Sequence, residues 1–155
     1  MKAETRLFGT IDIADDKIIL LENGMIGLPE MRQFALIFDE EKKRERQKQI
    51  MWLQSMDDPQ TAFPVMQPEI VKPDYTLTIN EELLKPLGEM EDEDAFILVT
   101  VTAAPKKEDT SVNLKAPFVI NTRTNRGIQV IVEEDYPVKF KISGALKALK
   151  EKAGE

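Results

Sequence analysis

Short strand-like runs separated by turn residues are the feature that most limits how this chain can fold. Within each run apolar residues alternate with polar ones or follow one another, and Gly, Pro, Asn or Asp comes next. Runs of this kind predict β-strands joined by tight turns, as in an antiparallel sandwich or barrel. The runs are residues 5–13, 17–21, 34–38, 50–54, 62–66, 75–79, 95–101, 116–120, 127–132 and 138–142.

Helical pattern is scarce. The clearest alternation is in residues 75–79, where apolar side chains and threonines take opposite faces, as in a strand. Asn80 is a typical N-cap and predicts a short helix that ends near Pro86. Residues 143–152 offer a narrow apolar edge and predict at most one short terminal helix.

The chain of 155 residues has no Cys and no His. Thiol nucleophiles, disulfides, imidazole bases and the usual zinc ligands are therefore excluded. The sequence contains neither a glycine-rich phosphate-binding motif nor a nucleophile-elbow motif. These observations disfavour an enzyme, and we expect no catalytic residues, no metal and no cofactor.

The charge balance also limits the kinds of partner that the protein can bind. The chain has 21 basic and 28 acidic residues, a net charge of −7, and an acidic surface repels phosphate backbones. The basic stretch 42–48 follows three acids and has no aromatic residue to stack a base, so it is interpreted as a solvated loop or short helix. No apolar run approaches a membrane span or a signal peptide. We expect a soluble cytoplasmic protein that binds neither nucleic acid nor membranes directly.

Asp57 and Asp58 lie side by side between two apolar runs, and Pro59 follows. Asp favours turns because its carboxylate accepts hydrogen bonds from nearby backbone N–H groups, and the residue before a proline avoids the helical region. A turn is the leading interpretation, with a partner contact second and catalysis third. The spacing of an EF-hand calcium site is absent.

The segment 89–94 concentrates acids immediately before an apolar run. Its acidic residues are Glu89, Glu91, Asp92, Glu93 and Asp94. The simple interpretation is an exposed loop kept soluble by its charge. The functional interpretation is electrostatic, with an acidic lobe that steers a basic partner or repels RNA from it.

The segment GMIGLPEM combines turn residues with apolar side chains. If Met25, Ile26, Leu28 and Met31 are exposed, they form an adaptable apolar patch that suits another protein chain. Burial beneath the neighbouring strands is an equal alternative. Met66 is a further candidate for an apolar partner contact.

Several segments together resemble a known family. In order, they are NGMIGLPEMRQFAL, WLQSMDDPQTAFPVMQP, KPDYTLTI, FILVTVT and TSVNLKAPFVINTRTNRGIQVI. Their order and spacing are similar to those of the flagellar assembly factor FliW, over about Phe8 to Tyr136. The most specific parts are Leu53-Gln54-Ser55-x-Asp57-Asp58-Pro59 and Val112-Asn113-Leu114-x-Ala116-Pro117-x-x-x-Asn121. The chain departs from the family at Glu30-Met31, where Gly-Phe is common, and in the highly charged stretch 39–49.

The resemblance implies a mainly β, compact antiparallel barrel-like single domain at 1–142, with one or two short helices and a short helix or tail at 143–155. It implies a non-enzymatic regulator that binds the RNA-binding translational repressor CsrA, antagonises it by an allosteric or electrostatic route, and is itself sequestered by cytoplasmic flagellin. Asn113 and Asn121 join the apolar and acidic residues above as candidate partner contacts. The alternatives are a small β-barrel module that binds metal or carbohydrate through its acidic loops, and a carboxylate hydrolase.

Overall fold

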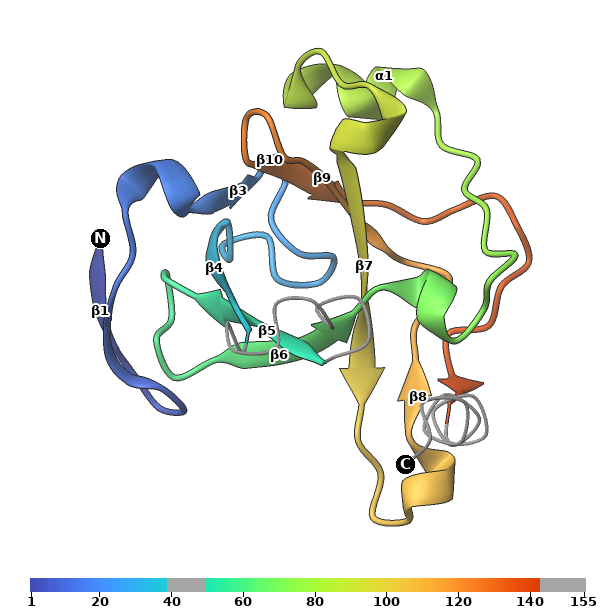
Figure 1. Cartoon of the computed structure of the whole chain (residues 1–155), viewed down its shortest axis with the longest axis horizontal. Helices are drawn as coiled ribbons and strands as arrows, with labels where there is room; N and C mark the ends of the chain where they lie inside the picture. Colours follow the sequence, from blue (N-terminus) through green and yellow to red (C-terminus); the bar gives the residue numbers. More distant parts are fainter. Residues whose placement is uncertain (39–49, 143–155) are drawn as a thin grey trace.

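A closed β-barrel forms the centre of the computed structural model, which describes residues 1–38 and 50–142 (Figure 1). Its strands hydrogen-bond in the order β7-β6-β5-β4-β3-β10-β9, and β9 pairs back with β7 to close the ring. These strands are β3 (Ile19–Leu21), β4 (Gln33–Ile37), β5 (Met51–Ser55), β6 (Ala62–Met66), β7 (Ala95–Thr102), β9 (Phe118–Asn121) and β10 (Arg126–Gln129). The predicted mainly β, barrel-like fold is confirmed.

One pairing in the ring is parallel. Arg126 and Gly127 of β10 lie opposite Leu20 and Leu21 of β3, whereas the other barrel pairings are antiparallel. Gly127 suits this crowded position, because a Cβ atom there would lie 3.0 Å from the backbone carbonyl oxygen of Val119 in β9 and 3.2 Å from a side-chain carbon of Leu21 in β3. A glycine in a strand commonly marks such a close approach of the neighbouring backbone.

Smaller elements surround the barrel. A separate hairpin consists of β1 (Lys2–Thr5) and β2 (Gly9–Asp12), while β8 (Ser111–Val112) and β11 (Phe140–Lys141) extend the sheet beyond β7. The short helical elements are α1 (Glu81–Leu84), η1 (Asp15–Lys17), η3 (Pro68–Ile70), η4 (Lys85–Leu87), η5 (Asp92–Asp94) and η6 (Lys107–Asp109). Asn80 caps α1 as predicted, since its side-chain oxygen accepts from the backbone N–H of Glu82 at 3.0 Å.

Two sequence-based expectations lie outside the described residues. They are the terminal helix or tail at 143–155 and the charged stretch 39–49.

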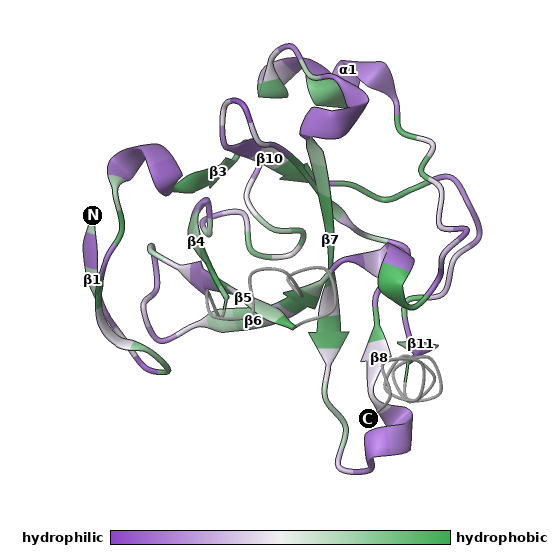
Figure 2. Ribbon diagram, in the orientation of Figure 1, coloured by the Kyte–Doolittle hydropathy of each residue, from purple (hydrophilic) through white to green (hydrophobic). Residues whose placement is uncertain are grey.

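The core occupies the barrel interior and two outer layers. Along β9, Phe118 and Ile120 belong to the interior cluster, whereas Val119 belongs to a cluster on the outer face. This alternation follows from the two-residue period of a strand. The segment 77–90, which includes α1, covers that outer face with Leu77, Ile79 and Leu84. Figure 2 shows hydrophobic strands at the centre and hydrophilic short helices around them.

The predicted strand at 75–79 is wrong, although its alternating burial is correct. Tyr75, Leu77 and Ile79 are partly buried and the threonines between them are exposed. Side chains take the hydrogen bonds that a strand partner would take. The N–H of Thr76 donates to the Tyr136 hydroxyl at 3.0 Å, and the N–H of Thr78 donates to the Glu134 carboxylate at 3.0 Å. The segment is therefore extended but forms no ladder.

The single strand predicted at 5–13 is wrong. The structure has two strands there: β1 begins earlier, at Lys2, and ends at Thr5, and a turn then leads into β2 at Gly9. Thr5 makes the turn, since its hydroxyl donates to the carbonyl of Gly9 at 2.8 Å and accepts from the N–H of Phe8 at 2.9 Å. Gly9 has a φ of +65°, a conformation that glycine adopts without strain. The hairpin tip contacts the barrel through an edge-on contact between Phe8 and Trp52, with ring centroids 6.1 Å apart.

Candidate protein-binding surface

The two adjacent aspartates form a turn, as the leading interpretation held. The carboxylate of Asp58 accepts from the hydroxyl of Thr61 at 2.7 Å and from the N–H of Gln60 at 3.3 Å. Asp57 is exposed but reaches the start of β4, where its Oδ2 accepts from the N–H groups of Arg32 at 2.8 Å and Gln33 at 2.7 Å. Both carboxylates therefore hold backbone in place.

Gln54, in the same motif, anchors this turn from beneath. Its side chain is fully buried, and its Nε2 donates to the carbonyls of Pro59 and Thr61, each at 3.1 Å. The hydroxyl of Ser55 accepts from the N–H of Asp58 at 2.9 Å. The polar residues of the motif thus encode the β5–β6 turn.

The apolar patch proposed for GMIGLPEM is wrong, and the alternative of burial is correct. Met25 and Met31 are 7% and 8% exposed and pack in the barrel interior, with Leu28 partly buried against them. A tight turn brings this about, because Met25 and Leu28 exchange backbone hydrogen bonds at 3.2 and 2.9 Å. Ile26 alone projects from the tip, 51% exposed.

Met66 and Asn113 also have structural positions. Met66 is 1% exposed and packs with Val99 on the outer layer beside β7, so it is not an exposed partner contact. Asn113 is partly buried, and its side-chain oxygen accepts from the N–H groups of Lys115 at 3.0 Å and Ala116 at 3.2 Å. This local bond forms the turn that follows β8.

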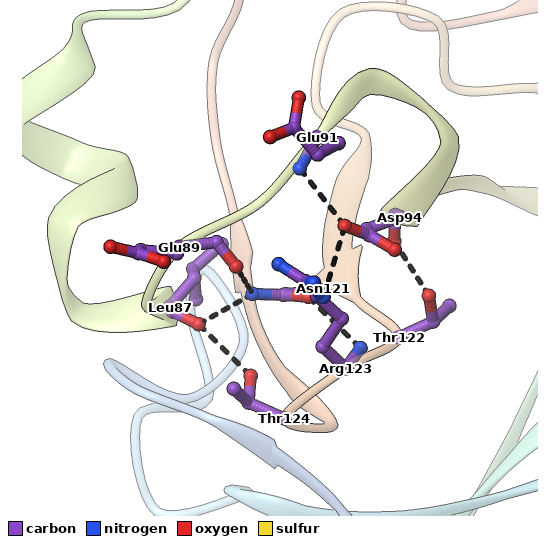
Figure 3. Close-up of polar contacts among 8 residues, drawn as sticks. All are labelled: Leu87, Glu89, Glu91, Asp94, Asn121, Thr122, Arg123 and Thr124. Carbon is purple, nitrogen blue, oxygen red and sulfur yellow. Dashed lines mark hydrogen bonds and ion pairs between the residues drawn. The ribbon is translucent and has the colours of Figure 1, made fainter.

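Asn121 is fully buried and joins the β9–β10 turn to the acidic segment 89–94 (Figure 3). Its Nδ2 donates to the carbonyls of Leu87 at 2.8 Å and Glu89 at 3.0 Å, and its Oδ1 accepts from the N–H of Arg123 at 3.0 Å. Because Asn121 is inaccessible, the expectation that it contacts a partner directly is wrong. Its role is to position the neighbouring acidic residues.

Asp94 makes the second connection between the acidic segment and this turn. Its carbonyl accepts from both the N–H and the hydroxyl of Thr122, each at 2.9 Å. Its carboxylate accepts from the N–H of Glu91 at 3.0 Å and lies 3.4 Å from the Nε of Arg123 (Figure 3). No local pattern indicates the ion pair with Arg123, which forms only when β9 and β7 pair.

The same contacts leave other acids of the segment free to face solvent. Glu89, Glu91, Asp92 and Glu93 are exposed, and η5 carries Asp92 and Glu93 as it leads into β7. The carboxylates of Asp92 and Glu93 have no hydrogen bond or ion pair with another described residue. A fixed backbone therefore presents unpaired negative charge, which favours interaction with a cationic surface.

Within residues 1–38 and 50–142, no three acidic side chains are close enough to form a candidate metal site. None of the helices in these ranges is long and apolar enough to cross a membrane.

The chain is similar to flagellar assembly factors across nearly its whole length. The family model described as FliW protein matches residues 2–142. The flagellar assembly factor FliW of Lachnospira eligens is 37% identical over 149 residues, covering 95% of this chain and 97% of the relative. That of Caldanaerobacter subterraneus is 39% identical, covering 95% and 96%. A crystal structure of the flagellar assembly factor FliW superposes with a TM-score of 0.81 at 30% identity, covering 92% of this chain and 96% of that one.

Proposed function

The chain belongs to the FliW family of flagellar assembly factors, and we propose that it works in the cytoplasm as a non-enzymatic antagonist of the RNA-binding repressor CsrA. Free flagellin sequesters the protein and so returns CsrA to repression. The observation that carries this proposal is the acidic segment 89–94, which Asn121 and Asp94 fix against the barrel with its remaining carboxylates facing solvent.

The antagonism proposed here is electrostatic. Two charges 4 Å apart interact by about 4 kcal/mol at an effective dielectric constant near 20. This interaction decays over about 8 Å at physiological salt. A few carboxylates held beside the RNA-binding groove of CsrA therefore oppose the phosphate backbone without occupying the groove. The protein acts on CsrA and makes no contact with RNA.

Size-exclusion chromatography with light scattering tests the proposal directly. The protein is mixed with CsrA from the same organism, and the mixture is then run again with added flagellin. We expect a stable CsrA complex that is lost or reduced when flagellin is present. If neither partner co-elutes at micromolar concentration, the proposed function is wrong.

A matched pair of double variants tests the acidic segment. Asp92→Lys with Glu93→Lys reverses two exposed carboxylates, and Glu69→Lys with Glu133→Lys makes the same change of net charge at exposed sites elsewhere. We expect the first pair to weaken CsrA binding and reduce its dependence on salt, and the control pair to change both much less. Equal effects would show that only total charge matters.

A further inference from the structure

The N-terminal hairpin carries an open strand edge. Among the described strands β1 pairs with β2 alone, and the hairpin stands outside the barrel (Figure 1). Met1 and Ile13 exchange two backbone hydrogen bonds, at 2.8 and 2.6 Å. In an antiparallel pair, such hydrogen-bonded positions alternate with positions whose N–H and carbonyl groups point away from the neighbouring strand. Lys2 and Glu4 therefore turn these groups toward the outer edge of β1.

The barrel holds this edge in place and limits its length. The N–H of Arg6, the next residue with the same orientation, donates to the carbonyl of Pro59 at 3.3 Å. The Nε of Arg6 donates to the carbonyl of Gln60 at 3.0 Å. The free part of the edge is thus confined to residues 2–4, and its backbone is already extended before any partner binds.

The two side chains on this edge carry opposite charges. Lys2 and Glu4 are exposed, and neither has a hydrogen bond or ion pair with another described residue. A charge on an edge strand normally discourages pairing with another chain. Here the two charges have opposite signs and lie two residues apart, so they can attract the same edge of a second copy.

Geometry selects one register for such a contact. Two β1 strands related by a twofold axis run antiparallel, and both outward-facing residues take part only when Ala3 lies on the axis. Lys2 then faces Glu4 of the second copy, so each pair exchanges backbone hydrogen bonds and places opposite charges across from each other. The registers centred on Lys2 or on Glu4 use only one of the two residues and place like charges together.

We propose that β1 pairs with β1 of a second copy of this chain through residues 2–4, and that the protein thereby forms a weak, closed dimer. The outer edge of β2 is the alternative partner, but its charged residue, Asp12, already lies 3.6 Å from the terminal ammonium of Met1. Pairing of β1 with β2 of another copy would also continue into open chains instead of closing. The dimer goes beyond the proposed function and involves neither the acidic segment 89–94 nor CsrA.

Sedimentation velocity of the whole protein from micromolar to millimolar concentration measures this association. We expect an equilibrium between monomer and dimer with a dissociation constant of about 0.1–1 mM, because so short a contact belongs to the weak class of interfaces. Backbone amide NMR over the same range locates the contact. The signals of Lys2 and Glu4 should shift with concentration, and that of Thr10 in β2 should shift much less.

A set of charge variants tests the register. Lys2→Glu and Glu4→Lys each place like charges opposite one another, and each should raise the dissociation constant by about tenfold or more. The double variant Lys2→Glu with Glu4→Lys restores opposite charges in the same register and should recover the original dissociation constant to within about threefold. Its net charge equals that of the unmodified protein.

Lys139→Glu is the matched control for Lys2→Glu. Lys139 is exposed and lies outside the hairpin, so the substitution makes the same change of net charge at a distant site. It should change the dissociation constant much less than Lys2→Glu does.

Four results would overturn the inference: no association at millimolar concentration, assembly beyond a dimer, concentration-dependent signals away from β1, or a double variant that binds no more tightly than the single variants. Failure of CsrA and flagellin to co-elute with the unmodified protein would refute the proposed function instead, which does not require this dimer. The two failures are thus distinguishable.

Discussion

Asn121→Ala should cost more stability than its small change in volume indicates. The substitution removes three hydrogen bonds from a fully buried side chain: two that it donates, to Leu87 and Glu89, and one that it accepts from the N–H of Arg123. The carbonyl of Leu87 keeps the hydroxyl of Thr124 at 2.9 Å. One carbonyl and one N–H therefore lose these partners.

A buried polar group left unpaired costs about 1–3 kcal/mol. Because Glu89 is exposed, water can replace part of the hydrogen bonding that its carbonyl loses. We therefore expect Asn121→Ala to lower the free energy of unfolding by about 2–3 kcal/mol. At this chain length, the melting temperature would fall by about 5–10 °C. Urea unfolding and a thermal melt measure both quantities.

Asn113→Ala is the matched control, because the side chain of Asn113 also bonds to backbone groups, by accepting from two N–H groups, but is only partly buried. It should cost about 1 kcal/mol. Hydrogen exchange adds a local readout, since Asn121→Ala should speed exchange at Asp94 and Thr122 before global unfolding. If Asn121→Ala costs no more than Asn113→Ala and leaves these amides protected, the anchoring role assigned to Asn121 is wrong.

Three further predictions follow from local geometry. Gly24→Ala should lower the free energy of unfolding by about 2–4 kcal/mol, because Gly24 has a φ of +70° and a Cβ would lie 2.4 Å from the carbonyl oxygen of Pro29. Gly9→Ala, at a φ of +65° with open space around it, should cost only about 1 kcal/mol. If the Gly24→Ala and Gly9→Ala variants unfold at equal urea midpoints, the clash expected at Gly24 is wrong. Asp57→Ala should cost about 1–2 kcal/mol by leaving the N–H groups of Arg32 and Gln33 without their acceptor, whereas Asp57→Asn, which retains a side-chain oxygen, should recover most of the loss in the same urea assay. The hydroxyl of Thr78 donates to Glu134 at 2.6 Å and holds the pKa of that carboxyl below its usual 4.5. The associated stability is present above pH 4.5 and is lost as the pH falls through the lowered pKa, so Thr78→Val should raise the pKa of Glu134 in an NMR titration and weaken the acid dependence of melting.

The sequence was informative where structure is local. The strand at 62–66, the turn at Asp57 and Asp58, and the N-cap at Asn80 are as predicted. Each depends on residues within a few positions of one another, for which alternation and turn chemistry are reliable guides.

The failures involve distant residues. Alternation at 75–79 gave the correct buried face but could not show that Tyr136 and Glu134 replace a neighbouring strand. Met25 and Met31 are buried because they reach the barrel interior, which distant strands form together and which no local sequence pattern describes. The ion pair between Asp94 and Arg123 forms through the pairing of β7 with β9, so no local pattern indicates it.

The parallel pairing of β3 with β10 also governs how the protein can be made. Leu20 and Arg126 are distant in sequence, so their contact raises the contact order and closes a long loop at an entropic cost. β3 leaves the ribosome well before β10. Until β10 follows, β3 lacks one of its two neighbours and leaves an open sheet edge. Nascent chains with such an edge are prone to aggregate. The barrel therefore completes its ring only after β10 has been synthesised, and slow translation between β3 and β10 lengthens the interval in which the unpaired edge is exposed.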